Sequence, residues 1–301
     1  MNSFNIFNTA KIAQKVRLIG GAVMFRHTLF SLPFAITAIL LETNGHPAPQ
    51  KVILILIAAT AGRNAANALN RVIDADIDKK NERTSDRHIP RGALSKKALL
   101  VFAFVLCAVV AFAACMLNWL CAALLPAAAI LIGGYSFSKR FTWLCHYWLG
   151  LACCCAVMGS FLALTGHFAV RYFVLALAHC LWVAGFDIIY ALQDIAFDRA
   201  ERLHSIPARF GAGTARIIAA VSHFVSIAAL CMVPVFWNVS VIYLTAVCVS
   251  ALLLFAEHRI ALGKMGLFHI HKEHRIRIAS YSINEIVPLV ILLGTILDIY
   301  A

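Results

Sequence analysis

The chain has 301 residues, of which 62% are hydrophobic and 13% charged, and its formal net charge is +12. Soluble domains are roughly half apolar and about a quarter charged, so this composition excludes an ordinary soluble domain and predicts a polytopic helical membrane protein. The basic residues lie in short connections between apolar runs and not in a patch with interleaved aromatic residues, which argues against nucleic-acid binding. No polar linker divides the sequence, so we expect one domain over residues 1–301.

The first 27 residues and the cysteines add two expectations. Residues 1–27 carry Lys11, Lys15 and Arg17 but no apolar core followed by a cleavage site. We therefore expect an interfacial amphipathic segment and not a signal peptide. The ten cysteines all fall within apolar runs and lack zinc-ligand spacing, which is typical of small buried hydrophobic residues.

Nine apolar runs have roughly the 20 residues that a helix needs to cross a bilayer. In chain order, the predicted helices cover residues 28–42, 52–73, 98–117, 119–138, 144–165, 171–190, 214–237, 239–256 and 278–299. The connections between them alternate between the two faces of the membrane. The three long connections, residues 74–97, 191–213 and 257–277, all fall on the face that also receives the N-terminus.

The distribution of basic residues predicts that this face is cytoplasmic. Of the 26 Lys and Arg residues, only Lys51 and Arg171 border the opposite face, while Arg63 and Arg71 lie within the second predicted helix. An excess of Lys and Arg is typical of the cytoplasmic connections of membrane proteins. We therefore expect an integral multi-pass protein of a bacterial inner membrane, with its long loops and its chemistry on the cytoplasmic side.

A polar stripe runs along the second predicted helix and past its end. Its members follow one another at spacings of four, three, four and four, and they are Arg63, Asn67, Asn70, Asp74 and Asp78. Helical periodicity places such positions on one face. Ionisable residues at membrane depth are costly and usually face a cavity or a partner, so the stripe predicts a functional site.

The sixth predicted helix ends in a matching stripe, which consists of Asp187, Tyr190, Asp194 and Asp198. The residues that follow are similar as well. After Asp78 and again after Asp198, the chain has a basic residue, then Glu-Arg, then Ile-Pro and then Arg, before a new helix begins. This pattern indicates an internal duplication that is in register at the acidic pairs.

The four aspartates and Asn70 would converge on one cavity if the two helices faced each other. Clustered carboxylates repel one another unless cations neutralise them, and oxygen ligands suit Mg²⁺, which completes its shell with water and phosphate oxygens. Arg83, Arg87 and Arg199 follow the two stripes and suit the remaining phosphate charge. The pattern predicts a Mg²⁺–diphosphate site at a membrane surface, with helix-capping carboxylates paired to loop arginines as the alternative.

At these residues the sequence resembles the UbiA superfamily of intramembrane prenyltransferases. NRVIDADID (70–78) is similar to the family's first Asp-rich motif, and DIIYALQDIAFD (187–198) is similar to its second. YSFSKR (135–140) resembles the segment that follows the family's fourth helix. The resemblance spans nearly the whole chain, and it implies an all-α fold of about nine transmembrane helices around a central cavity.

The resemblance implies transfer of a prenyl chain from an isoprenyl diphosphate to an aromatic acceptor. Two Mg²⁺ ions would be held by Asn70, Asp74, Asp78, Asp194 and Asp198. The groups expected to share the diphosphate charge are Arg83, Arg87, Lys139, Arg140 and Arg199. Tyr135 and Tyr190 would orient the diphosphate or stabilise an allylic cation through their rings, with plain packing as the alternative.

The acceptor is predicted from resemblance alone, and 4-hydroxybenzoate in respiratory quinone synthesis is the first choice. RNAANALNRVID (63–74) resembles a subgroup described as 4-hydroxybenzoate polyprenyltransferase-like, some members of which serve the futalosine route to menaquinone. Other relatives prenylate haem or dihydroxynaphthoate. Asn67, Asn70, Asp187 and Tyr190 are expected to contact substrate, and Arg63 would meet an acceptor carboxylate or pair with a neighbouring Asp.

A divalent-cation transporter is the alternative from another functional class, and a non-catalytic lipid-diphosphate binder is a third. Transporter sites lie near the bilayer midplane, often at broken helices, whereas these acids lie at helix ends and are followed by basic residues. The sequence therefore favours the enzyme. Its expected partners are the lipid bilayer, the isoprenyl diphosphate and the acceptor, and neither nucleic acid nor an obligate protein partner is indicated.

Overall fold

The computed structural model describes residues 17–23, 28–263 and 272–301, and no strand occurs among them. The expected N-terminal interfacial segment, residues 1–27, lies largely outside the described residues, although residues 17–22 are helical. The helices of the rest of the chain are α2 (Thr28–Thr43), α3 (Pro49–Ile73), α4 (Ala75–Lys80), α5 (Lys96–Leu117), α6 (Trp119–Ala123), α7 (Leu125–Ser138), α8 (Cys145–Thr165), α9 (Val170–Ala191), α10 (Ile195–Ala200), α11 (Ile206–Cys231), a 3₁₀ turn (Val233–Val235), α12 (Val241–Ala261), α13 (Lys272–Arg277), a π-helical segment (Ile278–Ile283) and α14 (Asn284–Tyr300).

Seven spans within the described residues are long and apolar enough to cross a membrane. The apolar helices α2 and α7 are shorter, so the all-α membrane architecture is confirmed while the number of nine crossings stays a prediction. Large apolar side chains point outward, as Phe104 (64% exposed) and Phe224 (74% exposed) illustrate. A surface of this kind suits hydrocarbon, because lipid tails solvate apolar side chains as well as a protein core does.

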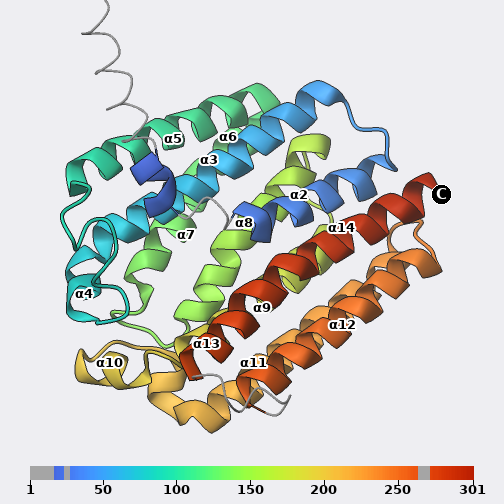
Figure 1. Ribbon diagram of the computed structural model, residues 1–301. Helices are drawn as coiled ribbons and strands as arrows, with labels where there is room; N and C mark the ends of the chain where they lie inside the picture. Colours follow the sequence, from blue (N-terminus) through green and yellow to red (C-terminus); the bar gives the residue numbers. More distant parts are fainter. Residues whose placement is uncertain (1–16, 24–27, 264–271) are drawn as a thin grey trace, which may run out of the picture.

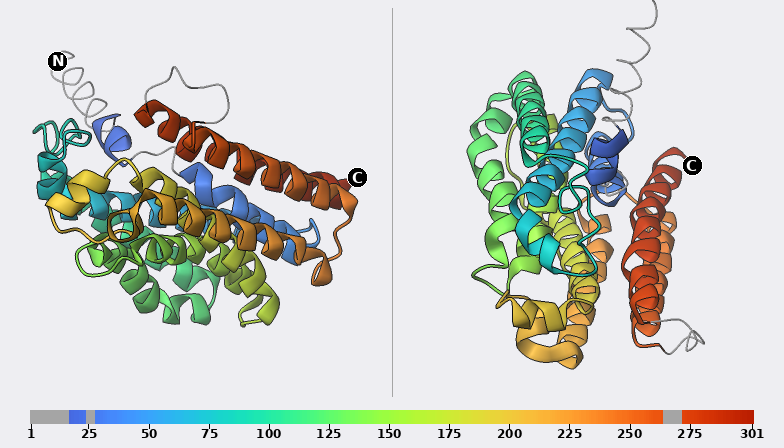
Figure 2. Two further views of the ribbon diagram at one scale, coloured as in Figure 1. Left: turned by 90° about the horizontal axis from the view of Figure 1, so that it is seen from below. Right: turned by 60° about the vertical axis from the view of Figure 1, so that its left-hand side comes forward.

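The long helices lie side by side, and α9 is their centre (Figures 1 and 2). It packs between α8 and α11, while α3 pairs with α5, and α14 contacts both α2 and α12. The main core forms around Trp182 of α9, which contacts Phe30 and Phe34 of α2. Helix α9 is 72% buried over its membrane-spanning window, and its polar residue His179 is fully buried within the protein.

The predicted duplication is matched by local geometry at both acidic motifs. Helix α3 gives way at Asp74 (φ −90°, ψ 1°) to the six-residue helix α4. Helix α9 ends at Ala191, and Asp194 (φ −97°, ψ 4°) starts the six-residue helix α10. The next long helices, α5 and α11, are each capped by a serine hydroxyl, from Ser95 and Ser205. Helices α4 and α10, which follow the two acidic motifs, lie at the same end of the molecule (Figure 1).

Two predicted helices differ from the observed ones. The run 119–138 is divided into α6 and α7 at Leu124, because Pro126 occupies the first turn of α7 and has no backbone N–H to continue the earlier helix. Helix α11 begins at Ile206 and not at residue 214, with a non-helical Gly211 (φ 80°) inside it. The second Ile-Pro pair is thus a helix N-terminus, where proline is well tolerated.

Candidate active site

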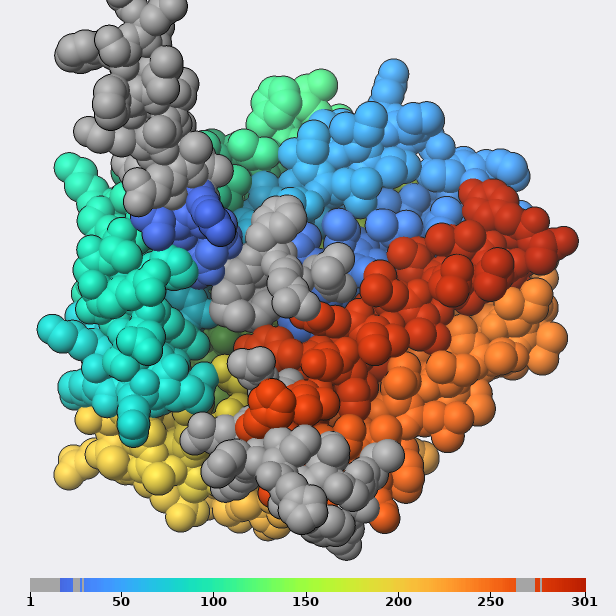
Figure 3. Space-filling view, viewed as in Figure 1, coloured from blue at the N-terminus to red at the C-terminus, as the bar shows by residue number. Residues whose placement is uncertain are grey.

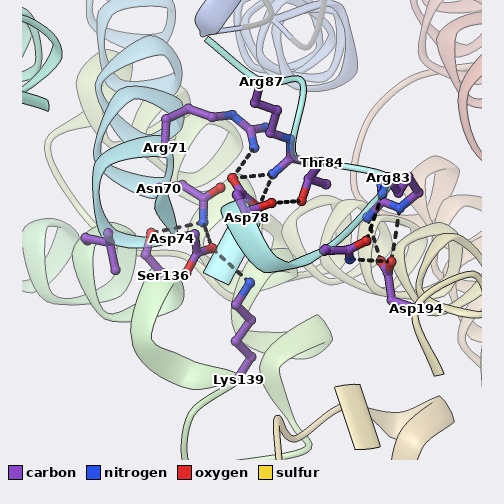
Figure 4. A network of polar contacts seen from close by, with 12 residues as sticks. Asn70, Arg71, Asp74, Asp78, Arg83, Thr84, Arg87, Ser136, Lys139 and Asp194 are labelled. Carbon is purple, nitrogen blue, oxygen red and sulfur yellow. Dashed lines mark hydrogen bonds and ion pairs between the residues drawn. The ribbon is translucent and has the colours of Figure 1, made fainter. Parts of the chain in front are cut away.

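Asp74 is the centre of the first acidic group. Its carboxylate accepts a hydrogen bond from Asn70 Nδ2 at 2.8 Å, and Lys139 Nζ lies 3.0 Å from Oδ2 (Figure 4). Arg140 donates to Oδ1 at 3.2 Å and to the carbonyl of Ile73 at 2.9 Å. The backbone break after α3 places this carboxylate, which is only 3% exposed as a residue, against the end of α7. The first Asp-rich motif and the 135–140 segment, which were both predicted to form the site, therefore meet at Asp74.

Asp78, one turn further along, is bound by the loop that follows α4. Arg87 Nη1 donates to both of its carboxylate oxygens at 2.7 Å, and Arg71 Nη1 lies 3.7 Å from Oδ2. The hydroxyl of Thr84 donates to the Asp78 backbone carbonyl at 3.0 Å. The loop is thereby folded back over the acidic motif (Figure 4). This contact keeps a cation beside the carboxylate and orders the loop.

The second acidic group is joined to the first repeat by Arg83. Its guanidinium binds Asp194 through Nε at 3.0 Å and Nη2 at 2.6 Å, and Nη1 donates to the hydroxyl of Tyr190 at 2.5 Å. Asn81 also donates to Asp194, at 3.1 Å. Burial lowers the pKa of Arg83, but its bonds to Asp194 outweigh burial and raise that pKa above the usual value. Arg83 therefore stays a cation that ties the two repeats together.

Asp198 has a different partner from the other three aspartates. The hydroxyl of Ser205, the cap of α11, donates to Asp198 Oδ2 at 2.7 Å. Burial raises the pKa of Asp198, and the Ser205 hydrogen bond opposes this shift. In the part of the chain that the structure describes, no arginine pairs with Asp198, and Lys139 only partly offsets the effect of burial on its pKa. Asp198 is therefore a candidate to bind an added cation.

One cavity of about 780 Å³ is lined by Asn70 and by the four aspartates just described, Asp74, Asp78, Asp194 and Asp198. The acidic motifs and the basic loop form its charged end, and mostly apolar residues of α3, α5, α7, α8 and α9 form most of the remaining wall. Figure 3 shows the loop after α4 lying against the α10 segment at the edge of the molecule. The cavity therefore has a charged end and an apolar remainder, which we call the apolar chamber. This division suits a ligand with a charged head and an apolar tail.

The donor set at the charged end fits Mg²⁺. Among the described residues, no three His, Cys, Asp or Glu side chains enclose a metal ion by themselves. Mg²⁺ does not need such a cage, because it usually binds one or two carboxylates and takes its other oxygens from water and phosphate. The carboxylate and amide oxygens present are of the hard type that this ion prefers. The candidate ligands are Asn70, Asp74, Asp78, Asp194 and Asp198.

The remaining predicted residues fall into two groups. Those that line the cavity are Arg63, Asn67, Arg83, Arg87, Tyr135, Lys139, Asp187 and Tyr190. Arg140 approaches Asp74 without lining the cavity. Arg199 is exposed and donates to the carbonyl of Ala208 at 2.9 Å, so the structure does not bring it to the charged end of the cavity.

Sequence reasoning missed several residues that contact the predicted ones. Asn81 and Ser205 bind the second aspartate pair, and His146 at the start of α8 binds Asp187 with 2.7 Å between Nδ1 and Oδ2. Each is a single polar residue without a periodic neighbour, so spacing gave no signal for it. For Ser205, the matching Ser95 before α5 is a signal that the duplication offered.

The known proteins that this chain is similar to are prenyltransferases. A model of the UbiA prenyltransferase family matches residues 31–264. A 4-hydroxybenzoate octaprenyltransferase of Methylococcus capsulatus is 34% identical over 187 residues, which are 62% of this chain and 64% of that relative. A protoheme IX farnesyltransferase of Tropheryma whipplei is 35% identical over 176 residues, 57% of each protein. These alignments span less than two thirds of the relatives' own length.

Solved structures have the same fold. The apo structure of a UbiA homolog from Aeropyrum pernix K1 matches with a TM-score of 0.79 and 30% identity, over 90% of this chain and 98% of that chain. A UbiA homolog from Archaeoglobus fulgidus bound to GPP and Mg²⁺ matches with a TM-score of 0.64, over 96% of this chain and 100% of that chain. At 17% identity the second likeness shows the fold alone.

Proposed function

Because this chain belongs to the UbiA prenyltransferase family, we propose that it transfers a polyprenyl chain from an isoprenyl diphosphate to an aromatic acceptor. The observation that carries the proposal is the cavity itself. Two acidic motifs and basic side chains that include Arg83, Arg87 and Lys139 line its charged end, and mostly apolar residues line the rest. A prenyl diphosphate has the same division into a charged head and an apolar tail.

The diphosphate would lie between the two acidic motifs. Two Mg²⁺ ions held by the candidate ligands named above would neutralise its charge and improve it as a leaving group. The Archaeoglobus fulgidus homolog, which binds GPP and Mg²⁺, supports this part of the proposal. Arg83, Arg87 and Lys139, now bound to carboxylates, are the chain's own donors for the phosphate oxygens.

The chemistry begins with cleavage of the bond between the prenyl carbon and the diphosphate oxygen, whose electron pair leaves with the diphosphate. Tyr135 and Tyr190 line the cavity, and their rings would stabilise the allylic cation. A ring carbon of the acceptor attacks the cation and then loses its proton. The apolar chamber would hold the prenyl chain and exclude water, which otherwise competes with the acceptor for the cation.

We propose 4-hydroxybenzoate as the acceptor, in respiratory quinone synthesis at a bacterial inner membrane. Arg63 supports an acceptor with a carboxylate. It lines the cavity two helical turns from Asn70, its Nη1 contacts only the weak acceptor Cys153 Sγ at 2.7 Å, and its Nε is buried without a hydrogen-bond partner among the described residues. The Methylococcus relative supports this acceptor as well. Haem, dihydroxynaphthoate and a futalosine-route precursor are the alternatives.

The test is a transfer assay with purified protein in liposomes, Mg²⁺, radiolabelled long-chain prenyl diphosphate and a panel of these acceptors. We expect labelled product with 4-hydroxybenzoate and release of diphosphate in equal amount. Flux of a divalent cation without product or released diphosphate would instead support the transporter. Product with another acceptor alone would keep the prenyltransferase and replace the acceptor.

A further inference from the structure

His146 is the first-turn residue of α8, and its side chain forms part of the cavity wall. It is 3% exposed and is held between two other elements. On one side, Nδ1 lies 2.7 Å from Asp187 Oδ2 of α9. On the other side, the backbone N–H of Ile206, the first residue of α11, points at Nε2 at 3.4 Å. The imidazole thus bridges two helices beside the substrate cavity.

These two contacts determine the tautomer. A backbone N–H can only donate, so Nε2 of His146 must be the unprotonated acceptor. The ring proton is then on Nδ1, where it is donated to Asp187. This arrangement makes Nδ1 of His146 the donor and Oδ2 of Asp187 the acceptor, so the ring fixes one oxygen of that carboxyl group.

Asp187 has a different kind of partner from three of the other aspartates that were predicted to form the site. Asp74, Asp78 and Asp194 are each bound by Lys or Arg. Within the described residues, the ion-pair partner of Asp187 is His146, and neither Lys nor Arg pairs with it. Its side chain is 24% exposed and lines the cavity two turns before Asp194. An imidazole leaves more of the carboxylate's capacity to accept hydrogen bonds than a bidentate arginine does.

We infer that His146 is a positioning residue for Asp187, which it holds with one oxygen directed into the cavity to accept a hydrogen bond from the acceptor substrate. The inference rests on the proposed function, because it assigns Asp187 to the acceptor and not to the diphosphate. The arrangement also fixes the register of α8, α9 and the start of α11 around the acceptor. Misplacement of such a group by about 1 Å is enough to reduce turnover on the order of 100-fold.

The test compares His146→Leu with His146→Asn in the transfer assay. Asn places an amide Nδ2 near the position of Nδ1 and keeps the donor to Asp187, whereas Leu keeps bulk and loses the donor. We expect Leu to lower kcat on the order of 100-fold and to raise the acceptor KM, with the prenyl diphosphate KM unchanged. Asn should restore most of the loss.

Asp187→Asn supplies a second measurement that does not depend on how His146 variants fold. It should reproduce the kcat loss of His146→Leu, and the double variant should lose little more than either single one, because both act on one hydrogen bond. Equal losses in Leu and Asn, an unimpaired Leu variant, or an altered prenyl diphosphate KM would each overturn the inference. A wild-type protein that prenylates no acceptor would remove the proposed function and this inference with it.

Discussion

At the scale of single residues, the first acidic motif contains one aspartate that lies outside the cavity and can serve as a control for the two that line it. Asp74 and Asp78 line the cavity, whereas Asp76, between them, is exposed and binds Lys96 on the outer side. Hydrogen bonding to Lys96 lowers the pKa of Asp76. The three aspartates carry the same side chain and differ in where they point. Their helical register, and not their chemistry, decides which of them serve the site.

We therefore predict that Asp194→Asn and Asp74→Asn abolish Mg²⁺-dependent turnover, while Asp76→Asn retains it. Asparagine keeps the size of the side chain and removes the charge on which the metal depends. Initial rates over a Mg²⁺ titration in the transfer assay provide the measurement. Substantial turnover by both cavity variants at saturating prenyl diphosphate would remove the two-metal model.

Arg63 allows a prediction about the acceptor. If its guanidinium binds the acceptor carboxylate, Arg63→Gln should raise the KM for 4-hydroxybenzoate by roughly 10-fold or more, since hydrogen bonds to charged groups contribute about 1.5–3 kcal/mol. The KM for prenyl diphosphate should not change. Competition by 4-hydroxybenzyl alcohol is the matched control, because an uncharged analogue should bind both proteins alike. Equal KM values for the carboxylate in both proteins would assign Arg63 a structural role.

At the scale of elements, the close packing of α8 against α9 depends on Gly150. A Cβ at Gly150 would lie 2.3 Å from the backbone carbonyl of Cys180 in α9, whereas a Cβ at Gly159 of the same helix meets nothing within 4 Å. Small residues let membrane helices approach this closely. Overpacking typically costs about 1–3 kcal/mol, so Gly150→Ala should lower the free energy of unfolding by that amount.

Thermal unfolding in detergent is the measurement, and Gly159→Ala is the control. The control should unfold at or above the wild-type temperature, because alanine favours a helix over glycine by about 1 kcal/mol. An unchanged unfolding temperature for Gly150→Ala would show that α8 and α9 are not packed as the structure describes.

Sequence reasoning located the elements of the site better than the contacts within it. The spacings of Asn70, Asp74 and Asp78 and of Asp194 and Asp198 were enough to place these residues on one cavity, because helical register is a local property. Arg199 was grouped with them by its neighbours in the chain, yet it turns outward to Ala208. His146 was missed, since only the packing of α8 against α9 brings it to Asp187.

At the scale of the whole molecule, the two repeats are joined at the charged end of the cavity. Lys80 of α4 binds Glu201 at 2.6 Å just beyond α10, and Arg83 binds Asp194. The exposed Lys80–Glu201 pair contributes little to stability, whereas Arg83 binds Asp194, which is one of the proposed metal ligands. If Asp194 binds metal and diphosphate as proposed, we expect substrate to rearrange the contact between the loop after α4 and the second motif.

The predicted nine crossings place the two termini on opposite faces of the membrane, with the N-terminus and the long loops in the cytoplasm. Alkaline phosphatase fused after Ala301 should then be active, and the same enzyme fused within the loop 82–92 should be inactive. Green fluorescent protein at these sites should give the reverse pattern. Phosphatase activity from the loop fusion would contradict the predicted orientation.

The central claim is that the charged end and the apolar chamber of one cavity together perform prenyl transfer. Its most direct test is the formation of prenylated 4-hydroxybenzoate by wild-type protein and by Asp194→Asn, each with Mg²⁺ and with excess EDTA. We expect product only from the wild type with Mg²⁺, since both the carboxylate and the ion are needed to expel diphosphate. Product formation that survives both EDTA and the loss of Asp194 would contradict the account.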